Sequence, residues 1–560
     1  MGKRRTIGEL ARQLPDGAWR ADYGACVQQR LMSRRIGPIA LAALSIVALA
    51  CAVGLFLLLY AASVHAFLPD SDGATPVLEA NAMMHGHPLL SGWAISLDSF
   101  WLVDTVWYML AIVLVGIHPF LMHAVPALIG TLVVILGVVI ATDERRGAAA
   151  LAAGGVVVAV LGLPSHAWAN FFLRGPWHIG TALWALIAFY ALRKPRFGWG
   201  FAVAVVFLTA GMLGDLQMAA IGVGPLFIAG LFAMARQRQL KAGTVQVAAA
   251  LGSAALWEIV RRITKAIGAF SIAPANPHAG FHQMLINVRH GLHEATLLLG
   301  TGSSYYGLGG APSGLSDVHI VSVVVVGLAA AAAVVALVWG ILSGRETVVA
   351  SAEESGWRLD DMLVLAAMGG FAAYCFLAFN ADPTFARYLI TPLIFLTILA
   401  GRMVGRIVSQ GNLGVIGRLA AGLGLAVAGC YGAVVAFELN QPAPVQPVGA
   451  LASFLESHGL TRGLGAYWTA SIVTVQSSDK VIVRPVVTHD GRVYRYTRNS
   501  ASYWYGGSFQ FLVYDTALPF GGVDSTTAAA TFGRPARTYT VNGIYKVLVW
   551  PKPIRVATKS

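Results

Sequence analysis

The chain has 560 residues, of which 57% are hydrophobic and 12% are charged, and its mean hydropathy is +0.67. Soluble globular proteins are about half apolar and about a quarter charged, so this composition excludes an ordinary soluble protein. The net charge of +13 does not indicate a nucleic-acid partner, because most Lys and Arg residues lie in short clusters between long apolar runs, where they report membrane topology. We expect a membrane protein built from many transmembrane helices.

The N-terminal segment is basic. Residues 1–35 contain eight Lys or Arg residues and three acidic residues, which predicts a cytoplasmic N-terminus. The apolar run Ile36–Tyr60 is too long for the hydrophobic region of a signal peptide and predicts an uncleaved first transmembrane helix. This helix would bring the following residues to the outer side of the membrane.

The next stretch, Ser63–Asp104, is unusually polar for this chain, with five carboxylates, three histidines and two tryptophans. Asp70 and Asp72 follow the first helix directly. This pair can supply a general base, bind a divalent metal, or simply form a solvated turn. His85 and His87 can bind a ligand or make hydrogen bonds within the loop. We interpret the stretch as a candidate catalytic loop.

The topology depends on residues 100–117, which either cross the membrane or lie flat on its outer surface. If they cross, Arg145, Arg146 and every later basic cluster fall outside. If they lie flat, these clusters fall inside, as the positive-inside rule requires. Trp101 and Trp107 also suit an interfacial helix. We choose the flat helix, so the first outer loop runs from residue 61 to 117.

With this choice, residues 36–438 form a transmembrane domain of about eleven spans. After the first helix, the spans are expected at 118–141, 147–163, 176–192, 198–214, 216–235, 242–260, 318–342, 360–379, 386–405 and 413–437. All fourteen histidines then lie on or near the outer side, and none lies in an inner loop. Groups able to do chemistry are therefore concentrated on one face.

The outer ends of later spans carry further candidates for substrate binding. Arg174 and His178 lie between two spans, and Asp215 and Gln217 lie in a tight outer turn. Arg387 stands near the start of a span, where a charge is costly and is a functional candidate by default. The alternatives are an ordinary cap for Asp215 and a side chain that extends to the interface for Arg387.

The outer loop 261–317 is long enough to contain structure of its own. Residues Met284–Leu299 look helical, and Arg289 and His293 share one face with other basic groups. Such a face suits an anionic lipid headgroup; the alternative is a solvated face of an interfacial helix. Beyond residue 439 the composition changes, and alternating runs between Gly and Asp turns predict a small soluble α/β domain, 439–560, outside the membrane.

These features together resemble the GT-C superfamily of polytopic membrane glycosyltransferases. The closest similarity is to bacterial members of the protein-mannosyltransferase (GT39) type and to the arabinofuranosyl and mannosyl transferases of cell-envelope assembly. The similar motifs are Asp72-Gly73-Ala74, Glu79 to Met83, His85 to Trp93, Gly214-Asp215, Arg387-Tyr388-Leu389 with Pro392, His458-Gly459-Leu460, Tyr467 to Ala470 and Phe532 to Pro535.

The resemblance implies an inverting transfer of a sugar from a polyprenyl-phosphate donor to an envelope glycan, lipid or protein at the outer face of the cytoplasmic membrane. It implies that an acidic residue of the first outer loop is the base, and by position this is Asp72, with Asp70 as second choice. Positive groups would stabilise the leaving phosphate. No cofactor is expected, although some members of the class use a divalent metal.

Two other functions are compatible with the sequence. A transporter or flippase of an envelope precursor would suit many spans, but transporters place charges near the middle of the membrane, whereas here they collect outside. A non-catalytic assembly subunit would use the C-terminal domain for binding and would not need Asp70 or Asp72.

Overall fold

The computed structural model describes residues 38–96, 98–235, 240–272, 278–301, 317–343, 356–378, 383–410, 414–517 and 520–557. The predicted cytoplasmic segment 1–35 and part of the long loop 261–317 lie outside these residues. The chain divides into two compact units, Met1–Leu55 and Phe56–Ser560. The site described below belongs entirely to the second unit.

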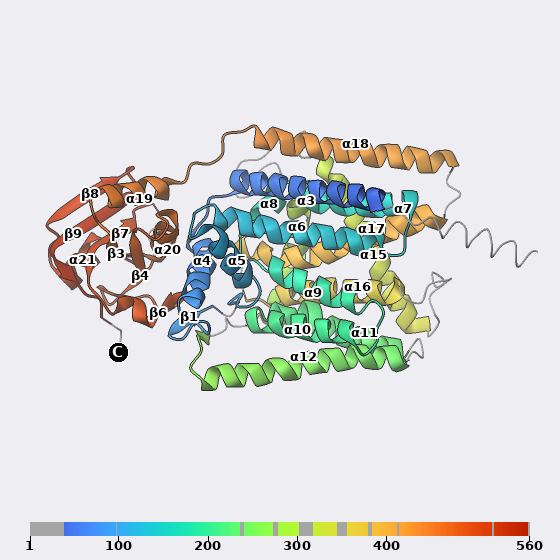
Figure 1. The fold of residues 1–560 in the computed structure, drawn as a ribbon, viewed down its shortest axis with the longest axis horizontal. Coiled ribbons are helices and arrows are strands. Elements are labelled where there is room, and N and C mark those ends of the chain that lie inside the picture. The colour runs from blue at the N-terminus through green and yellow to red at the C-terminus, as the bar shows by residue number, and fades with distance from the viewer. Residues whose placement is uncertain are drawn as a thin grey trace, which may run out of the picture. The chain divides into compact units, whose positions relative to one another are not determined.

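Apolar helices make up most of the chain up to residue 439, because nearly every long run of the sequence is rich in Leu, Val, Ala and Gly. Helix α6 packs against α9 and α17, and the three run roughly parallel (Figure 1). These helices are α3 (Pro38–Ala66), α6 (Leu121–Thr142), α7 (Gly147–Val157), α9 (Ile179–Ala191), α10 (Trp199–Gly214), α11 (Gly224–Ala235), α12 (Leu240–Ala266), α15 (Ile320–Ser343), α16 (Gly356–Cys375), α17 (Ile390–Gln410) and α18 (Gly414–Leu439).

Further helical elements lie between these helices. They are α4 (Ser71–Met84), α5 (Thr105–Val115), α8 (His166–Phe172) and α13 (Phe281–Thr296), with the short π or 3₁₀ segments η1 (Val158–Gly162), η2 (Ala219–Val223), η3 (Leu297–Thr301), η4 (Asp317–His319) and η5 (Pro383–Leu389).

Among the described residues, six helices are long and apolar enough to cross a membrane. There are seven if the pair Gly147–Gly162 and His166–Phe172, bent by 81°, counts as one span. Four more apolar helices have between 10 and 17 residues, fewer than the ~20 that cross a bilayer unaided. The prediction of a polytopic helical membrane protein is confirmed, and the count of eleven spans stays a prediction.

Residues 100–117, which decide the predicted topology, contain helix α5. This helix has only 11 residues. Its length is about 16 Å, roughly half the thickness of the hydrocarbon core. Leu110, Val113 and Leu114 are exposed, whereas Tyr108 and Ile112 are buried. A helix this short, apolar on its exposed side, has the form expected of a segment that lies in the membrane interface.

An ion-pair cluster joins Arg145, which precedes α7, to residues of α16 and α17. Arg402 and Arg406 both donate to the carboxylate of Asp360. Arg402 also donates to the carbonyl of Ile140 at 2.7 Å, and Arg145 donates to the carbonyl of Arg402 at 2.9 Å. The cluster therefore ties the ends of α6, α16 and α17 together.

We expect Asp360→Asn to destabilise the protein by about 3–5 kcal/mol, because the buried guanidinium of Arg402 and the half-buried one of Arg406 would lose their shared counter-charge. Thermal unfolding in detergent measures this change. The control is Glu258→Gln, which removes an exposed ion pair with Arg261 and Arg262 and should leave the unfolding temperature unchanged. Equal effects of the two substitutions would contradict a structural role for the cluster.

The C-terminal part is the predicted α/β domain. Its six-stranded sheet has the order β5-β4-β3-β7-β9-β8, in which β3 is parallel to β4 and β7 and the other pairs are antiparallel. Its elements are α19 (Pro447–Ser457), β3 (Arg462–Ala466), α20 (Tyr467–Gln476), β4 (Ile482–His489), β5 (Arg492–Arg495), η6 (Ser502–Tyr505), β7 (Phe509–Asp515), α21 (Ser525–Phe532), β8 (Arg537–Val541) and β9 (Tyr545–Ile554).

A second, very small sheet joins three distant parts of the sequence. Strand β1 (Trp93–Ile95) pairs with β2 (Ser271–Ile272) and with β6 (Ser500–Ala501). The first predicted outer loop, the long loop and the C-terminal domain therefore share backbone hydrogen bonds. Helix α4 also packs directly against α20 of the C-terminal domain (Figure 1).

Candidate functional site

Helix α4 places the Asp70–Asp72 pair. Asp70 caps the helix, because its backbone is extended and its side chain accepts a 3.0 Å hydrogen bond from the backbone N–H of Gly73. Asp72 follows in the first turn. The hydroxyl of Ser71 donates to the carbonyl of Tyr467 at 2.6 Å. The beginning of α4 is thus fixed both by its own cap and by the C-terminal domain.

Asp70 forms an ion pair with Arg174, with 2.9 Å between Oδ2 and Nη2. The same guanidinium donates from Nη1 to Asn170 at 3.3 Å, and Asn170 donates to the carbonyl of Ala66 at 3.0 Å. The Nε of Arg174 is buried and has no hydrogen-bond partner among the described residues. One donor of this arginine is therefore unpaired within the described part of the chain.

The Asp72 side chain is half-buried, and its carboxylate accepts a hydrogen bond from the hydroxyl of Tyr467. Burial, followed by the charge of Asp70, raises the pKa of Asp72 to about 6, although Tyr467, Arg387 and Arg174 act in the opposite direction. A carboxylate with this pKa is still mostly ionised at neutral pH and is a stronger base than an ordinary aspartate.

Arg174 and Arg387 approach the same aromatic ring. Their guanidinium carbons lie 4.9 Å and 5.7 Å from the centre of the Trp177 ring. Arg387 also interacts electrostatically with both Asp72 and Asp98. In the part of the chain that the structure describes, no carboxylate lies within ion-pair distance of Arg387. Two cations thus converge beside the Asp72 carboxylate.

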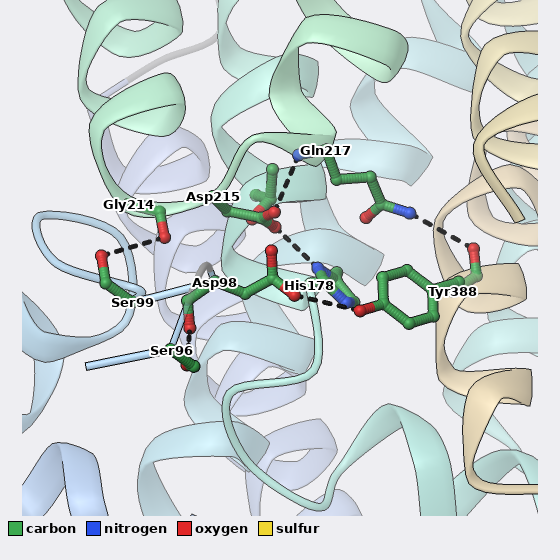
Figure 2. Close-up of polar contacts among 9 residues, drawn as sticks. Ser96, Asp98, Ser99, His178, Gly214, Asp215, Gln217 and Tyr388 are labelled. Carbon is green, nitrogen blue, oxygen red and sulfur yellow. Dashed lines mark hydrogen bonds and ion pairs between the residues drawn. The ribbon is translucent and has the colours of Figure 1, made fainter. Parts of the chain in front are cut away.

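A second group of polar side chains gathers around Asp98 and Asp215 (Figure 2). Tyr388 donates to Asp98 at 3.0 Å, and the Nδ1 of His178 donates to Asp215 at 2.7 Å. Gln217 donates from its backbone N–H to Asp215 at 2.9 Å and from its side chain to the carbonyl of Tyr388 at 3.3 Å. The His178 and Tyr388 rings are 4.5 Å apart.

The electrostatics of this second group differ between its two acids. Burial, followed by the charge of Asp215, raises the pKa of Asp98. Burial also opposes ionisation of Asp215, but His178 and the hydrogen bonds from Thr181 and Gln217 outweigh it and lower the pKa of Asp215. Asp215 is thus held as an anion by His178, whereas Asp98 is easier to protonate.

The structure brings together seven of the eleven residues singled out from the sequence. Asp70, Asp72, Arg174 and Arg387 form the first group around Trp177. The second group contains the other three, namely His178, Asp215 and Gln217.

The remaining four lie elsewhere, and their roles in substrate binding stay predictions. His85 is exposed and hydrogen-bonded to the carbonyl of Asn81, and His87 stacks on Tyr503 with 4.4 Å between ring centres. Arg289 and His293 are exposed on α13. None of the four makes a described contact with the Asp72 group.

Asp98, Tyr388 and Tyr467 also belong to the two groups but were not predicted as site residues. Asp98 was counted among the loop carboxylates, whereas Tyr388 and Tyr467 each belong to a motif named in the resemblance, so all three carried a signal. Nothing in the sequence shows that the C-terminal domain, which carries Tyr467, returns to α4. No three His, Cys, Asp or Glu side chains of the described residues meet in a metal-binding arrangement.

Comparison with solved structures identifies the fold. ArnT from Cupriavidus metallidurans in the apo state aligns with 90% of this chain and 98% of its own, with a TM-score of 0.50 and 13% identity. The chain has a GT-C fold. ArnT bound to undecaprenyl phosphate aligns with 89% of this chain and 97% of its own, with a TM-score of 0.50 and 11% identity.

An oligosaccharyltransferase from Archaeoglobus fulgidus, solved with zinc and sulfate, covers 82% of this chain and 68% of its own at 10% identity, with a TM-score of 0.44. No family model matches the sequence, and no curated protein sequence matches it. The likeness to ArnT confirms the predicted architecture, namely a GT-C-like helical membrane domain with a β-rich C-terminal domain.

Proposed function

We propose that the protein is a membrane glycosyltransferase that moves a sugar from a polyprenyl-phosphate donor to a hydroxyl group of an envelope glycan, lipid or protein. The observation that carries this proposal is the Asp72 carboxylate, whose raised pKa suits a base, beside two arginines that suit a phosphate. The GT-C fold supports it, since ArnT with the same fold has been solved with undecaprenyl phosphate.

In the proposed reaction the acceptor oxygen attacks C1 of the sugar while Asp72 takes the hydroxyl proton. The bond between C1 and the phosphate oxygen breaks, and the phosphate leaves with the electron pair. A single displacement of this kind inverts the configuration at C1. Arg387 and Arg174 stabilise the charge that develops on the phosphate.

The second group is proposed to bind the transferred sugar. Asp98, Asp215 and His178 offer both acceptors and donors of hydrogen bonds next to Arg387, which is the chemistry that sugar hydroxyls require. By the positive-inside argument, this site faces away from the cytoplasm. The lipid tail of the donor would lie against the apolar helices of the transmembrane domain.

A donor panel tests the proposal. Purified full-length protein in vesicles is offered radiolabelled sugars on polyprenyl phosphate together with an extract of envelope glycans, lipids and proteins. If the protein transfers sugar, the label should move from the lipid to an acceptor, and free polyprenyl phosphate should appear in equal amount. Movement of intact donor across the vesicle membrane without cleavage would contradict the proposal and would favour a flippase.

A further inference from the structure

Tyr467 comes from the C-terminal domain yet lies against the base proposed above. It is the first residue of α20 and only 3% exposed. Its hydroxyl donates to Oδ1 of Asp72, and its backbone carbonyl accepts a hydrogen bond from Ser71. Among the described residues, no other donor contacts the Asp72 carboxylate. One oxygen of Asp72 is thus held, and Oδ2 is left to accept a proton.

Asn499 fixes the direction of the Tyr467 hydroxyl. The backbone N–H of Ser96 donates to Oδ1 of Asn499 at 3.2 Å, and Nδ2 of Asn499 donates to the Tyr467 hydroxyl at 2.9 Å. Because a backbone N–H can only donate, the amide must face Tyr467 with its nitrogen. The single proton of Tyr467 is therefore free to point at Asp72.

The backbone conformation at position 499 favours asparagine. Its φ is +50°, in the left-handed region that asparagine tolerates better than most residues. Asn499 immediately precedes β6, which pairs with β1 of the first outer loop. The small sheet therefore holds Asn499 and Ser96 in register.

We propose that Tyr467 and Asn499 are positioning residues for the general base, so that the C-terminal domain completes the active site. Tyr467 orients the Asp72 carboxylate and leaves one oxygen for the acceptor hydroxyl, and Asn499 orients Tyr467. The catalytic part of this inference rests on the proposed function. The effect of Tyr467 and Asn499 on the Asp72 carboxylate can be tested without any substrate.

The charged and titratable groups that act on Asp72 set the direction of the test. Asp70 raises the pKa of Asp72, whereas Arg174, Arg387 and Tyr467 lower it. A hydrogen bond donated to the ionised carboxylate favours the charged form. Removing the Tyr467 hydroxyl should therefore raise the pKa of Asp72 further. As the pH is lowered, Asp72 then becomes protonated, and stops acting as a base, at a higher pH than in the wild type.

Infrared titration of the full-length protein measures this shift. Subtracting the spectrum of Asp72→Asn from that of the wild type isolates the C=O band of protonated Asp72. We expect Tyr467→Phe to move the midpoint of this band upward by about one pH unit, and Asn499→Ala to move it less in the same direction. Asn499→Ala keeps the tyrosine, so it also serves if Tyr467→Phe folds poorly.

The matched control is Tyr503→Phe. Tyr503 lies in the same domain and accepts a hydrogen bond from Trp93 of the first outer loop at 2.9 Å, but it does not contact Asp72. The midpoint should not move in this variant. An equal shift with Tyr503→Phe, or an unchanged midpoint in both Tyr467→Phe and Asn499→Ala, would overturn the inference.

The rate of sugar transfer gives a second readout. In Tyr467→Phe the acidic limb of the pH–rate profile should move upward by the same amount as the infrared midpoint, and the plateau rate at pH 8 should also fall, because the carboxylate is no longer oriented. If the infrared midpoint shifts but transfer does not depend on Asp72, the contact between Tyr467 and Asp72 is supported and the proposed function is overturned. The two proposals therefore fail in different ways.

Discussion

Replacing Asp72 by asparagine is expected to lower the rate of sugar transfer by about 10²- to 10⁴-fold, the range that general bases contribute. Asparagine has nearly the same shape and can still accept the hydrogen bond from Tyr467, so the fold of α4 should persist. It cannot take a proton from the acceptor hydroxyl. Binding of the donor should change little, because the base acts on the acceptor.

Glu79→Gln is the control for this prediction. Glu79 lies on the same helix two turns later and is also buried, and burial raises its pKa well above the usual value. It has no place in the proposed reaction, so its amide should retain most of the wild-type rate. Similar losses in Asp72→Asn and Glu79→Gln would indicate that any buried acid of α4 matters for the fold rather than for proton transfer.

Replacing Arg387 by alanine is expected to lower transfer by about 10²- to 10³-fold, the usual cost of removing one group that stabilises developing charge. Its guanidinium lies near Trp177 and interacts electrostatically with Asp72 and Asp98. Binding of undecaprenyl phosphate, measured by native mass spectrometry, should weaken as well. Arg387→Lys should recover part of the rate, since lysine keeps the charge but loses the planar fork.

Arg261→Ala is the matched control, because Arg261 forms an exposed ion pair with Glu258 far along the sequence from the site. It should leave both transfer and lipid binding unchanged. If Arg387→Ala bound undecaprenyl phosphate as tightly as the wild type and transferred sugar at the same rate, the phosphate role would belong to another residue.

The membrane fold could be predicted from composition and hydropathy, because long apolar runs have few alternatives to spanning the bilayer. The C-terminal domain was visible in its alternating runs, which form β4 and β9. Among the site residues, Asp72, Arg174 and Arg387 could be singled out because charges are rare and costly in such a chain.

The contacts of these residues could not be predicted in the same way. Tyr467 is separated from Asp72 by 395 positions, and its place at the start of the motif Tyr467 to Ala470 does not indicate which residue it contacts. Asn499 depends on the pairing of β1 with β6, whose strands are too short to show a periodicity. Long-range pairing of this kind follows from the tertiary fold alone.

The most direct test of the central claim, that ionised Asp72 is the base, is the pH dependence of transfer in the wild type and in Asp72→Asn. Burial and the charge of Asp70 raise the pKa of Asp72 to about 6, and a base works only when deprotonated. The wild-type rate should therefore fall below about pH 6 and level off above it, and the residual rate of Asp72→Asn should lack this limb. The same midpoint in both proteins would show that another group, such as Asp98, titrates instead.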